Sequence, residues 1–93
     1  MIRSFQCRET EKVFNYQRTL AWSEGVRKAA LRRLYALDAA TSLLDLRSPP
    51  ANRLEKLQGD RAGQYSIRIN DQWRICFEWR DGHAWHVEIV DYH

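Results

Sequence analysis

Three consecutive segments in the second half of the chain alternate between apolar and polar residues, and this alternation constrains the fold more than any other feature. In GQYSIRIN, WRICFEW and AWHVEIVDYH, the large apolar residues occupy odd-numbered positions. Such a period of two is typical of strands that bury one face. The sequence therefore predicts three consecutive antiparallel strands near residues 64–69, 73–79 and 84–91, with their odd-numbered side chains facing a core.

The same parity predicts how the strands pair. Odd residues of adjacent antiparallel strands share a face only when the hairpin loop has an odd number of residues. Three-residue loops over 70–72 and 80–82 then set three pairs opposite each other: Ile67 and Ile75, Arg68 and Arg74, and Arg74 and Glu88. Like charges placed directly opposite are mildly destabilising. We therefore expect Glu88, and beyond it a phosphate, to neutralise this arginine pair.

The residues before these strands predict mostly helix. Residues 2–5 alternate like a short first strand, and residues 9–16 carry two apolar side chains among charges and predict a short helix. After Ser23, a good N-cap residue, one apolar face forms a long helix that closes with LDAAT. That face is made of Val26, Ala30, Leu34 and Leu37.

A pair of prolines separates this helical part from the sheet. Pro49 and Pro50 cannot continue a helix, and the residues that follow, 54–57, predict one further short strand. With 93 residues and 44% hydrophobic content, the chain fits one domain over residues 1–93. The predicted fold class is α+β, with two N-terminal helices on a small antiparallel sheet.

Charge and cysteine content narrow the possible functions. The net charge of +3 and a pI near 9.1 favour an anionic partner, or else only favour solubility. Cys7 and Cys76 lack the spacing of a zinc site and predict reduced thiols. We expect no signal peptide, membrane span, metal or cofactor, and a cytoplasmic location. On the long helix, four basic residues lie away from the apolar face and either are solvated or meet a nucleic acid or acidic partner: Arg27, Lys28, Arg32 and Arg33.

The even-numbered face of the sheet carries the candidate chemistry. Parity places Tyr92 on the open face with Arg68 and Arg74, and His93 follows with a carboxylate. RNA supplies its own nucleophile, the 2′-OH, so cleavage requires a base, an acid and cations for the charge that develops on the phosphate, and it requires no metal. Two guanidinium groups, a phenol and an imidazole would meet this requirement.

Several stretches of the chain resemble HigB toxins, a branch of the RelE-like toxin superfamily. They are MIRSF, LDAAT, LRSPPANRLEKLQGDRAGQYSIRINDQWRICFEW and the final VEIVDYH. The resemblance implies a ribosome-dependent mRNA endonuclease of a type II toxin–antitoxin pair, with two N-terminal helices against a small antiparallel sheet. It also implies a helix-turn-helix antitoxin of the HigA type as partner, and contact with operator DNA only through that antitoxin.

The resemblance carries family roles to individual positions. Arg74 stands at the arginine of the WR motif, Arg61 at the GDR arginine, and Asp91, Tyr92 and His93 at the terminal DYH. The expected catalytic residues are therefore Arg74, Asp91, Tyr92, His93 and Glu55. The expected RNA and phosphate contacts are Arg61, Arg68, Gln58 and Lys56.

Two positions depart from relatives. Glu55 stands where some members have a histidine, and Gln58 stands where some have a lysine before the glycine. The work of that histidine would then fall to Glu55 or His93, while Lys56 lies on the other strand face. A different class of function is a binding module that grips phosphate without cutting it. The DYH ending favours the endonuclease over that module, and the opposed arginine pair disfavours an inert domain.

Overall fold

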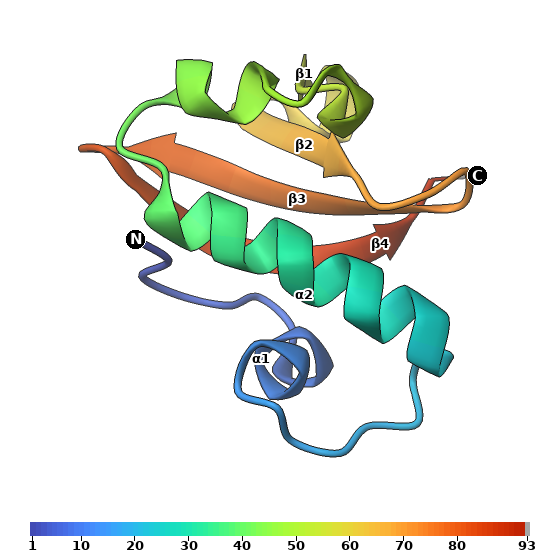
Figure 1. The fold of residues 1–93 in the computed structure, drawn as a ribbon. Coiled ribbons are helices and arrows are strands. Elements are labelled where there is room, and N and C mark those ends of the chain that lie inside the picture. Colours follow the sequence, from blue (N-terminus) through green and yellow to red (C-terminus); the bar gives the residue numbers. More distant parts are fainter. Residues whose placement is uncertain (93) are drawn as a thin grey trace.

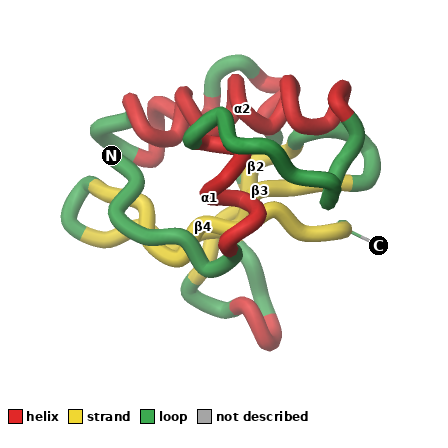
Figure 2. The backbone as a smooth tube through the Cα atoms, turned by 90° about the horizontal axis from the view of Figure 1, so that it is seen from below, coloured by secondary structure: helices red, strands yellow, loops and turns green. Residues whose placement is uncertain are grey.

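Two helices cover one face of a four-stranded antiparallel sheet in the computed structural model, which describes residues 1–92. Figure 1 shows α1 (Arg8–Phe14) and α2 (Glu24–Ala39) on the same side of the sheet, and Figure 2 shows α2 and the strands as separate layers. The strands pair in chain order: β1 (Glu55–Lys56), β2 (Gln64–Arg68), β3 (Trp73–Arg80) and β4 (His83–Asp91). Short 3-10 turns occupy η1 (Leu43–Arg47), η2 (Pro50–Asn52) and η3 (Gly59–Arg61). The predicted α+β architecture is confirmed.

The long helix begins at the predicted cap. The Ser23 side chain accepts a hydrogen bond from the Val26 N–H, and the helix ends at Ala39, two residues before the end of LDAAT. Its apolar stripe reaches the core, since Ala30, Leu34 and Leu37 are fully buried. The predicted first helix is also present but ends at Phe14. Within residues 1–92, no helix is long and apolar enough to cross a membrane.

The segment predicted as a first strand lies along β4 without forming a regular strand. Ile2 and Phe5 make isolated parallel bridges to Ala84 and Val87. Between these bridges the His86 N–H donates to the Ser4 side-chain oxygen at 2.8 Å. His86 has a positive φ of 54°, which interrupts the ladder and leaves two separate bridges in place of a strand.

The β2–β3 hairpin has the predicted register. Ile67 pairs with Ile75 and Arg68 pairs with Arg74. The Ile69 N–H donates to the Trp73 carbonyl at 2.9 Å, so the loop holds residues 70–72 as expected. The predicted core positions of this hairpin are correct, because Ile67 and Ile75 are fully buried.

The β3–β4 register differs from the prediction. The turn holds only Asp81 and Gly82, whose φ values of 54° and 78° suit a two-residue type I′ hairpin. A bulge in β4 then sets two residues, 86 and 87, against Phe77. Beyond the bulge, Arg74 pairs with Val90 and Cys76 pairs with Glu88. The predicted pairing of Arg74 with Glu88 is therefore wrong.

The bulge also changes which β4 residues face the core. Before it, Ala84 is fully buried and Trp85 is only half-buried, with the Arg80 guanidinium 4.7 Å from its ring centre. After it, Val87 and Ile89 are buried as predicted. The expectation that every odd residue faces the core thus fails at Trp85. The two-residue turn and the bulge together restore the predicted parity for the rest of the strand.

We expect the protein to lose stability when the hydroxyl of Thr10, a buried hydrogen-bond acceptor between α1 and β4, is removed. Thr10 is fully buried in α1, and its Oγ1 accepts a hydrogen bond of 3.0 Å from the Ile89 N–H. Thr10→Val keeps the shape but leaves this buried N–H without a partner, which should reduce the free energy of unfolding by about 1–3 kcal/mol. Urea denaturation measures the change. Equal stability of the variant and the parent would contradict this role of Thr10.

Candidate active site

The sheet face away from the helices is covered over part of its area. Arg61, at the end of η3, reaches this face with its side chain, which contacts Glu88 at 3.5 Å and donates to the Gln64 side chain at 3.0 Å. On the same face, Ser66, Arg74 and Cys76 are buried although they occupy even-numbered positions. The expected open face is therefore wrong around Arg74, which is only 4% exposed.

Arg74 is held from three directions. Its Nη1 lies 3.3 Å from a carboxylate oxygen of Glu55, and its Nη2 donates to the Arg53 carbonyl at 2.7 Å. The Tyr92 ring centre lies 4.6 Å from the guanidinium carbon, in cation–π contact. The position of the guanidinium is thus fixed before any ligand binds, which lowers the entropic cost of using it as a binding group.

A cavity of about 230 Å³, here named the Arg74 cavity, opens beside this guanidinium. It is lined by Arg53, Glu55, Arg68, Asn70, Asp71, Arg74 and Tyr92. Arg68 forms an ion pair with Asp71, and its Nε donates to the Asn70 carbonyl at 3.2 Å. Three guanidinium groups against two carboxylates leave a net positive lining. An anion such as a phosphate therefore fits it, in competition with Glu55 for Arg74.

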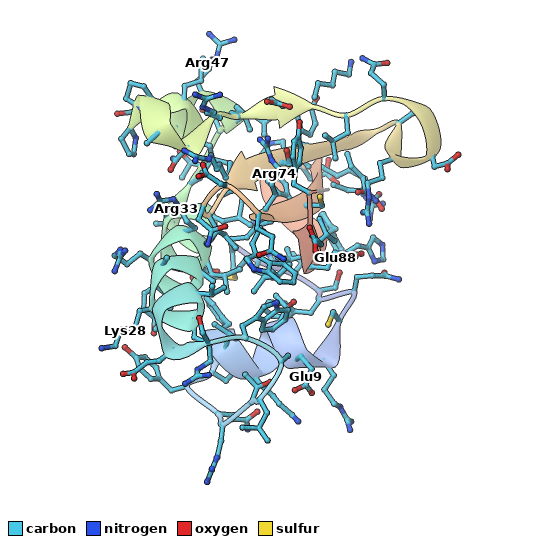
Figure 3. All side chains as sticks on the ribbon, turned by 90° about the vertical axis from the view of Figure 1, so that its right-hand side faces the viewer. Glu9, Lys28, Arg33, Arg47, Arg74 and Glu88 are labelled. Atoms are coloured by element: carbon cyan, nitrogen blue, oxygen red, sulfur yellow. The ribbon has the colours of Figure 1, made fainter. Side chains whose placement is uncertain are left out.

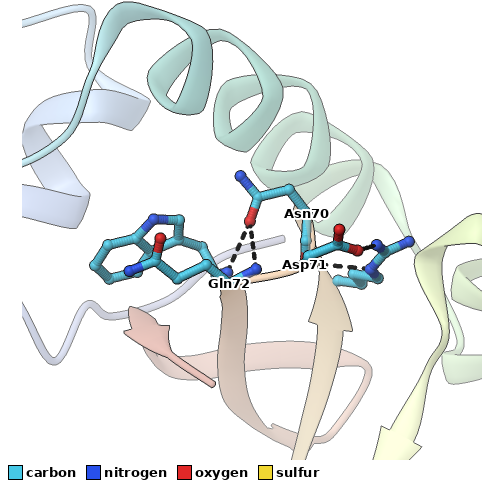
Figure 4. Close-up of polar contacts among 5 residues, drawn as sticks. Asn70, Asp71 and Gln72 are labelled. Atoms are coloured by element: carbon cyan, nitrogen blue, oxygen red, sulfur yellow. Dashed lines mark hydrogen bonds and ion pairs between the residues drawn. The ribbon is translucent and has the colours of Figure 1, made fainter. Parts of the chain in front are cut away.

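The β2–β3 loop is closed by its own side chains (Figure 4) and fixes the segment that carries Tyr92. The Asn70 side-chain oxygen accepts from the N–H groups of Gln72 and Trp73 at 2.9 and 2.8 Å, which closes the loop. The Tyr92 N–H donates to the Gln72 carbonyl at 2.6 Å, and the Gln72 side chain donates to an Asp91 carboxylate oxygen at 3.1 Å. Gln72 therefore holds both Asp91 and Tyr92 against the sheet.

The structure brings together some of the predicted site residues and separates others. Arg74, Arg68, Glu55 and Tyr92 line one cavity. Asp91 and Arg61 line a second hollow, which also touches Arg74 and Tyr92. The remaining two, Lys56 and Gln58, are exposed and line neither space. His93 lies outside the described residues, so its predicted role remains a prediction.

Some residues of the site were not predicted from the sequence. Arg53 reaches it because the η2 turn ends in a left-handed residue, with φ of 45° at Arg53 itself. Gln72 and Asn70 belong to a predicted loop, and their side chains are polar groups in a turn, which is a weak signal. Ser66 shares the even-numbered parity of Arg68 and Arg74, so the alternation did place it on this face.

The basic side of α2 is only partly free. Arg27 donates to the carbonyls of Thr19 and Trp22, and Lys28 forms an exposed pair with Glu24 at 3.2 Å. The Arg33 Nε donates to the Arg68 carbonyl at 3.1 Å. Figure 3 shows Arg33 toward the end of the sheet that carries Arg74, with Lys28 farther along the helix. Arg33 thus joins the helix to the strand that positions Arg68.

Both cysteines are free thiols, as expected. Cys7 is half-buried, whereas Cys76 is buried on the covered sheet face. Burial raises the pKa of the Cys76 thiol, so this group stays protonated near neutral pH and contributes a small apolar surface. Among residues 1–92, no group of three or more His, Cys, Asp or Glu side chains is placed to hold a metal ion.

Comparison with known proteins identifies relatives of the chain. Toxin HigB-1 of Vibrio cholerae serotype O1 is 49% identical over 59 residues, which cover 63% of this chain and 62% of that protein. Endoribonuclease HigB of Proteus vulgaris is 39% identical over 61 residues, which cover 66% of this chain and 65% of that protein. The chain thus spans less than two thirds of the length of these two relatives.

Solved structures share the fold at lower sequence identity. The YoeB-YefM complex from Staphylococcus aureus contains a chain with a TM-score of 0.62 and 22% identity, covering 100% of this chain and 98% of that chain. The YoeB dimer from the same organism has a TM-score of 0.58 and 23% identity, covering 99% and 97% of the respective chains. A family model described as RelE-like toxin of type II toxin-antitoxin system HigB matches residues 3–93. The chain therefore belongs to the HigB family of RelE-like toxins.

Proposed function

We propose that the chain is an endoribonuclease that cuts mRNA in the A site of the ribosome and thereby inhibits translation. The observation that carries this proposal is the Arg74 guanidinium, fixed beneath Tyr92 in a cavity lined by two further arginines. A fixed cation beside an accessible hollow suits the charge that builds up on a phosphate during transfer. The Proteus vulgaris relative is named as an endoribonuclease, which supports the same chemistry.

The proposed reaction uses the 2′-OH of the RNA and no metal. A base removes the 2′-OH proton, and the 2′-oxygen attacks the adjacent phosphorus. The bond from phosphorus to the 5′-oxygen of the next nucleotide breaks while an acid protonates that oxygen. The products are a 2′,3′-cyclic phosphate and a 5′-hydroxyl end. Arginines stabilise the negative charge on the phosphate oxygens in the transition state.

The residues of the Arg74 cavity match these roles. Arg74 and Arg68 hold the scissile phosphate, and a phosphate on Arg74 displaces the Glu55 carboxylate from its 3.3 Å contact. The displaced Glu55, with a side chain that is 45% exposed, is then free to act as the base. Tyr92, or His93, serves as the acid. Asp91 orients this end of the chain.

Residues outside the cavity contact the RNA farther from the cut. Arg61 adjoins Arg74 through the second hollow. Lys56 and Gln58 are exposed on β1 and beside η3, where they can meet the backbone of the strand. These contacts contribute affinity that depends on salt concentration, and they contribute little to the chemical step.

The proposed partners are the ribosome with its mRNA and an antitoxin of the HigA helix-turn-helix type. Operator DNA is contacted only through that antitoxin, and the complex is cytoplasmic. The family description names a toxin–antitoxin system, and the similar YoeB structure was solved with YefM bound. Co-expression with the neighbouring gene should relieve growth arrest and yield one complex that does not cut mRNA.

The end groups of the products test the proposed function. We expect purified protein added to ribosomes translating a defined mRNA to produce fragments with 5′-hydroxyl and 2′,3′-cyclic phosphate ends. A 2′-deoxy nucleotide at the cut position should abolish cleavage there, because it removes the nucleophile. Labelling of the downstream fragment by polynucleotide kinase without prior phosphatase treatment detects the 5′-hydroxyl, and ligation to the 3′ end of the upstream fragment only after its phosphate is removed detects the cyclic phosphate. Primer extension maps the cut and its loss with the 2′-deoxy nucleotide. Binding of mRNA or ribosomes without any cleavage would favour the alternative, a binding module that uses the arginine face.

A further inference from the structure

The β2–β3 loop connects two groups of the proposed site that lie on different strands. At one end of the loop, the Asn70 carbonyl accepts a hydrogen bond of 3.2 Å from the Arg68 Nε. At the other end, the Gln72 carbonyl accepts one of 2.6 Å from the Tyr92 N–H. Both acceptors are backbone atoms, so the shape of the loop backbone sets the position of Arg68 relative to Tyr92.

The side chain of Asn70 determines that shape. Its Oδ1 accepts from the N–H groups of Gln72 and Trp73 at 2.9 and 2.8 Å, and both bonds are drawn in Figure 4. In such an Asx-type turn, the side chain takes the place of a backbone acceptor. Without Oδ1, the loop keeps the bonds from the Ile69 and Asn70 N–H groups to the Trp73 carbonyl. Neither of these bonds involves Gln72, so the carbonyl that holds Tyr92 would lose its support.

The absence of charge on this side chain also matters, because Asn70 lines the Arg74 cavity. An aspartate could accept the same two hydrogen bonds. It would, however, add a third carboxylate to those of Glu55 and Asp71, against three guanidinium groups, and leave the lining with no net positive charge. Of the two side chains that form Asx-type turns, asparagine alone closes the loop and preserves the charge that attracts a phosphate.

We propose that Asn70 is a positioning residue for mRNA cleavage. It fixes the loop that holds Arg68 and Tyr92 at the correct spacing, and its amide preserves the positive charge of the Arg74 cavity. The inference rests on the proposed endonuclease function, in which Arg68 holds the phosphate and Tyr92 or His93 supplies the acid. Asn70 itself transfers no proton in this reaction. It acts through the geometry of the two groups that it holds.

Asn70→Ala removes the loop closure and leaves the charge of the cavity unchanged. At saturating ribosome–mRNA complex, the rate of single-turnover cleavage should fall by about 10- to 100-fold, since a displacement of about 1 Å can cost that much. The half-saturating concentration should stay close to that of the parent, because the same arginines remain. Thermal stability should change little, because Asn70 and Gln72 are exposed and water can bind the released N–H groups.

A measurement on the loop distinguishes positioning from a general loss of structure. In Asn70→Ala, the NMR order parameter of the Tyr92 amide should fall toward the flexible range, below about 0.6. The amides of Ile75 and Ile89, which pair with each other between β3 and β4, should keep the rigid value of about 0.85.

Asn70→Asp should show the opposite pattern. It keeps the loop closed, so the Tyr92 order parameter should match that of the parent, and the saturating rate should recover most of the loss seen with alanine. The added carboxylate should raise the half-saturating concentration several-fold relative to the parent, and this ratio should shrink as salt screens the charge. Asn15→Ala is the matched control, because Asn15 is exposed at the end of α1 and lines neither the Arg74 cavity nor the second hollow.

Three results would overturn this role of Asn70. The first is cleavage by Asn70→Ala at the saturating rate of the parent. The second is slow cleavage by Asn70→Ala while Tyr92 stays rigid, and the third is an Asn70→Asp protein that keeps Tyr92 rigid yet cuts as slowly as the alanine variant. A parent protein that cuts no mRNA would remove the endonuclease and, with it, the positioning role. The activity of the parent therefore distinguishes the two failures.

Discussion

Arg74→Ala should reduce the rate of mRNA cleavage by about 100-fold or more, as removal of one fixed donor to a developing charge does in other enzymes. Its Nη1 and Nη2 atoms are already oriented by Glu55 and the Arg53 carbonyl. A phosphate that replaces Glu55 gains a charge-assisted hydrogen bond from Nη1, and this bond strengthens as charge accumulates in the transition state. The loss should therefore appear in the rate of single-turnover cleavage more than in RNA binding.

Arg74→Lys shows whether charge alone is sufficient. Lysine keeps the positive charge but lacks the planar fork, so it should restore only a small part of the activity. Arg74→Lys also serves as a control for stability. Arg74 is almost fully buried, so alanine leaves a gap beneath Tyr92 that lysine partly fills. Glu55 is 45% exposed and can be rehydrated when its partner is removed, so both variants should fold. Thermal unfolding of each variant checks this.

Arg80→Ala is the matched control for Arg74. It removes the same charge from the far end of β3, where Arg80 stacks on Trp85 and lines neither the Arg74 cavity nor the second hollow beside it. We expect little change in cleavage. A folded Arg74→Ala protein that cuts mRNA as fast as the parent would exclude the proposed role of Arg74.

The register of β2 and β3 could be predicted because two independent signals agree there. The apolar alternation requires an odd loop, and residues 70–72 supply one without any irregularity. Between β3 and β4 the signals disagree. The Asp81-Gly82 dipeptide favours a two-residue turn, whereas parity requires an odd loop. The chain satisfies both by adding a bulge at His86, which no residue pattern in AWHVEIV indicates.

The candidate site could be predicted to the extent that it depends on parity. Arg68, Arg74 and Tyr92 lie on one face because they alternate with core residues, and the structure brings them to one cavity. The burial of Arg74 could not be predicted, since Glu55, the Arg53 carbonyl and the Tyr92 ring, which surround its guanidinium, come from three separate parts of the chain. Arg53 enters the cavity through a left-handed backbone at the end of a 3-10 turn, and an arginine gives no signal for that conformation.

Tyr92 is the second residue whose replacement should have a large effect. Its ring covers the Arg74 guanidinium, and its backbone N–H is fixed by Gln72 at 2.6 Å. Tyr92→Phe keeps the ring and removes only the hydroxyl. If that hydroxyl protonates the leaving 5′-oxygen, cleavage should fall by about 100- to 10,000-fold. Thermal stability should be unchanged, because the residue is 53% exposed and the ring contact remains.

Two further variants distinguish acid catalysis from positioning. Tyr92→Ala removes ring and hydroxyl together, and under acid catalysis by Tyr92 it should be little worse than Tyr92→Phe. A RNA with a better leaving group than a 5′-oxygen, such as a 5′-thio linkage at the cut, needs no acid and should restore cleavage by Tyr92→Phe. The same substrate tested with His93→Gln shows whether the imidazole shares this task.

Tyr16→Phe controls for the loss of a phenol hydroxyl elsewhere. Tyr16 is 77% exposed and lines a separate space beside α1 and α2, and it lines neither the Arg74 cavity nor the second hollow beside it. The variant should cleave like the parent. If Tyr92→Phe retains full cleavage while Tyr92→Ala loses it, the ring acts by holding Arg74, and the acid must be another group. That pattern would exclude Tyr92 as the acid, and the 5′-thio substrate would then not distinguish Tyr92→Phe from the parent. If the 5′-thio substrate instead restores cleavage by Tyr92→Phe and not by His93→Gln, the phenol is the acid.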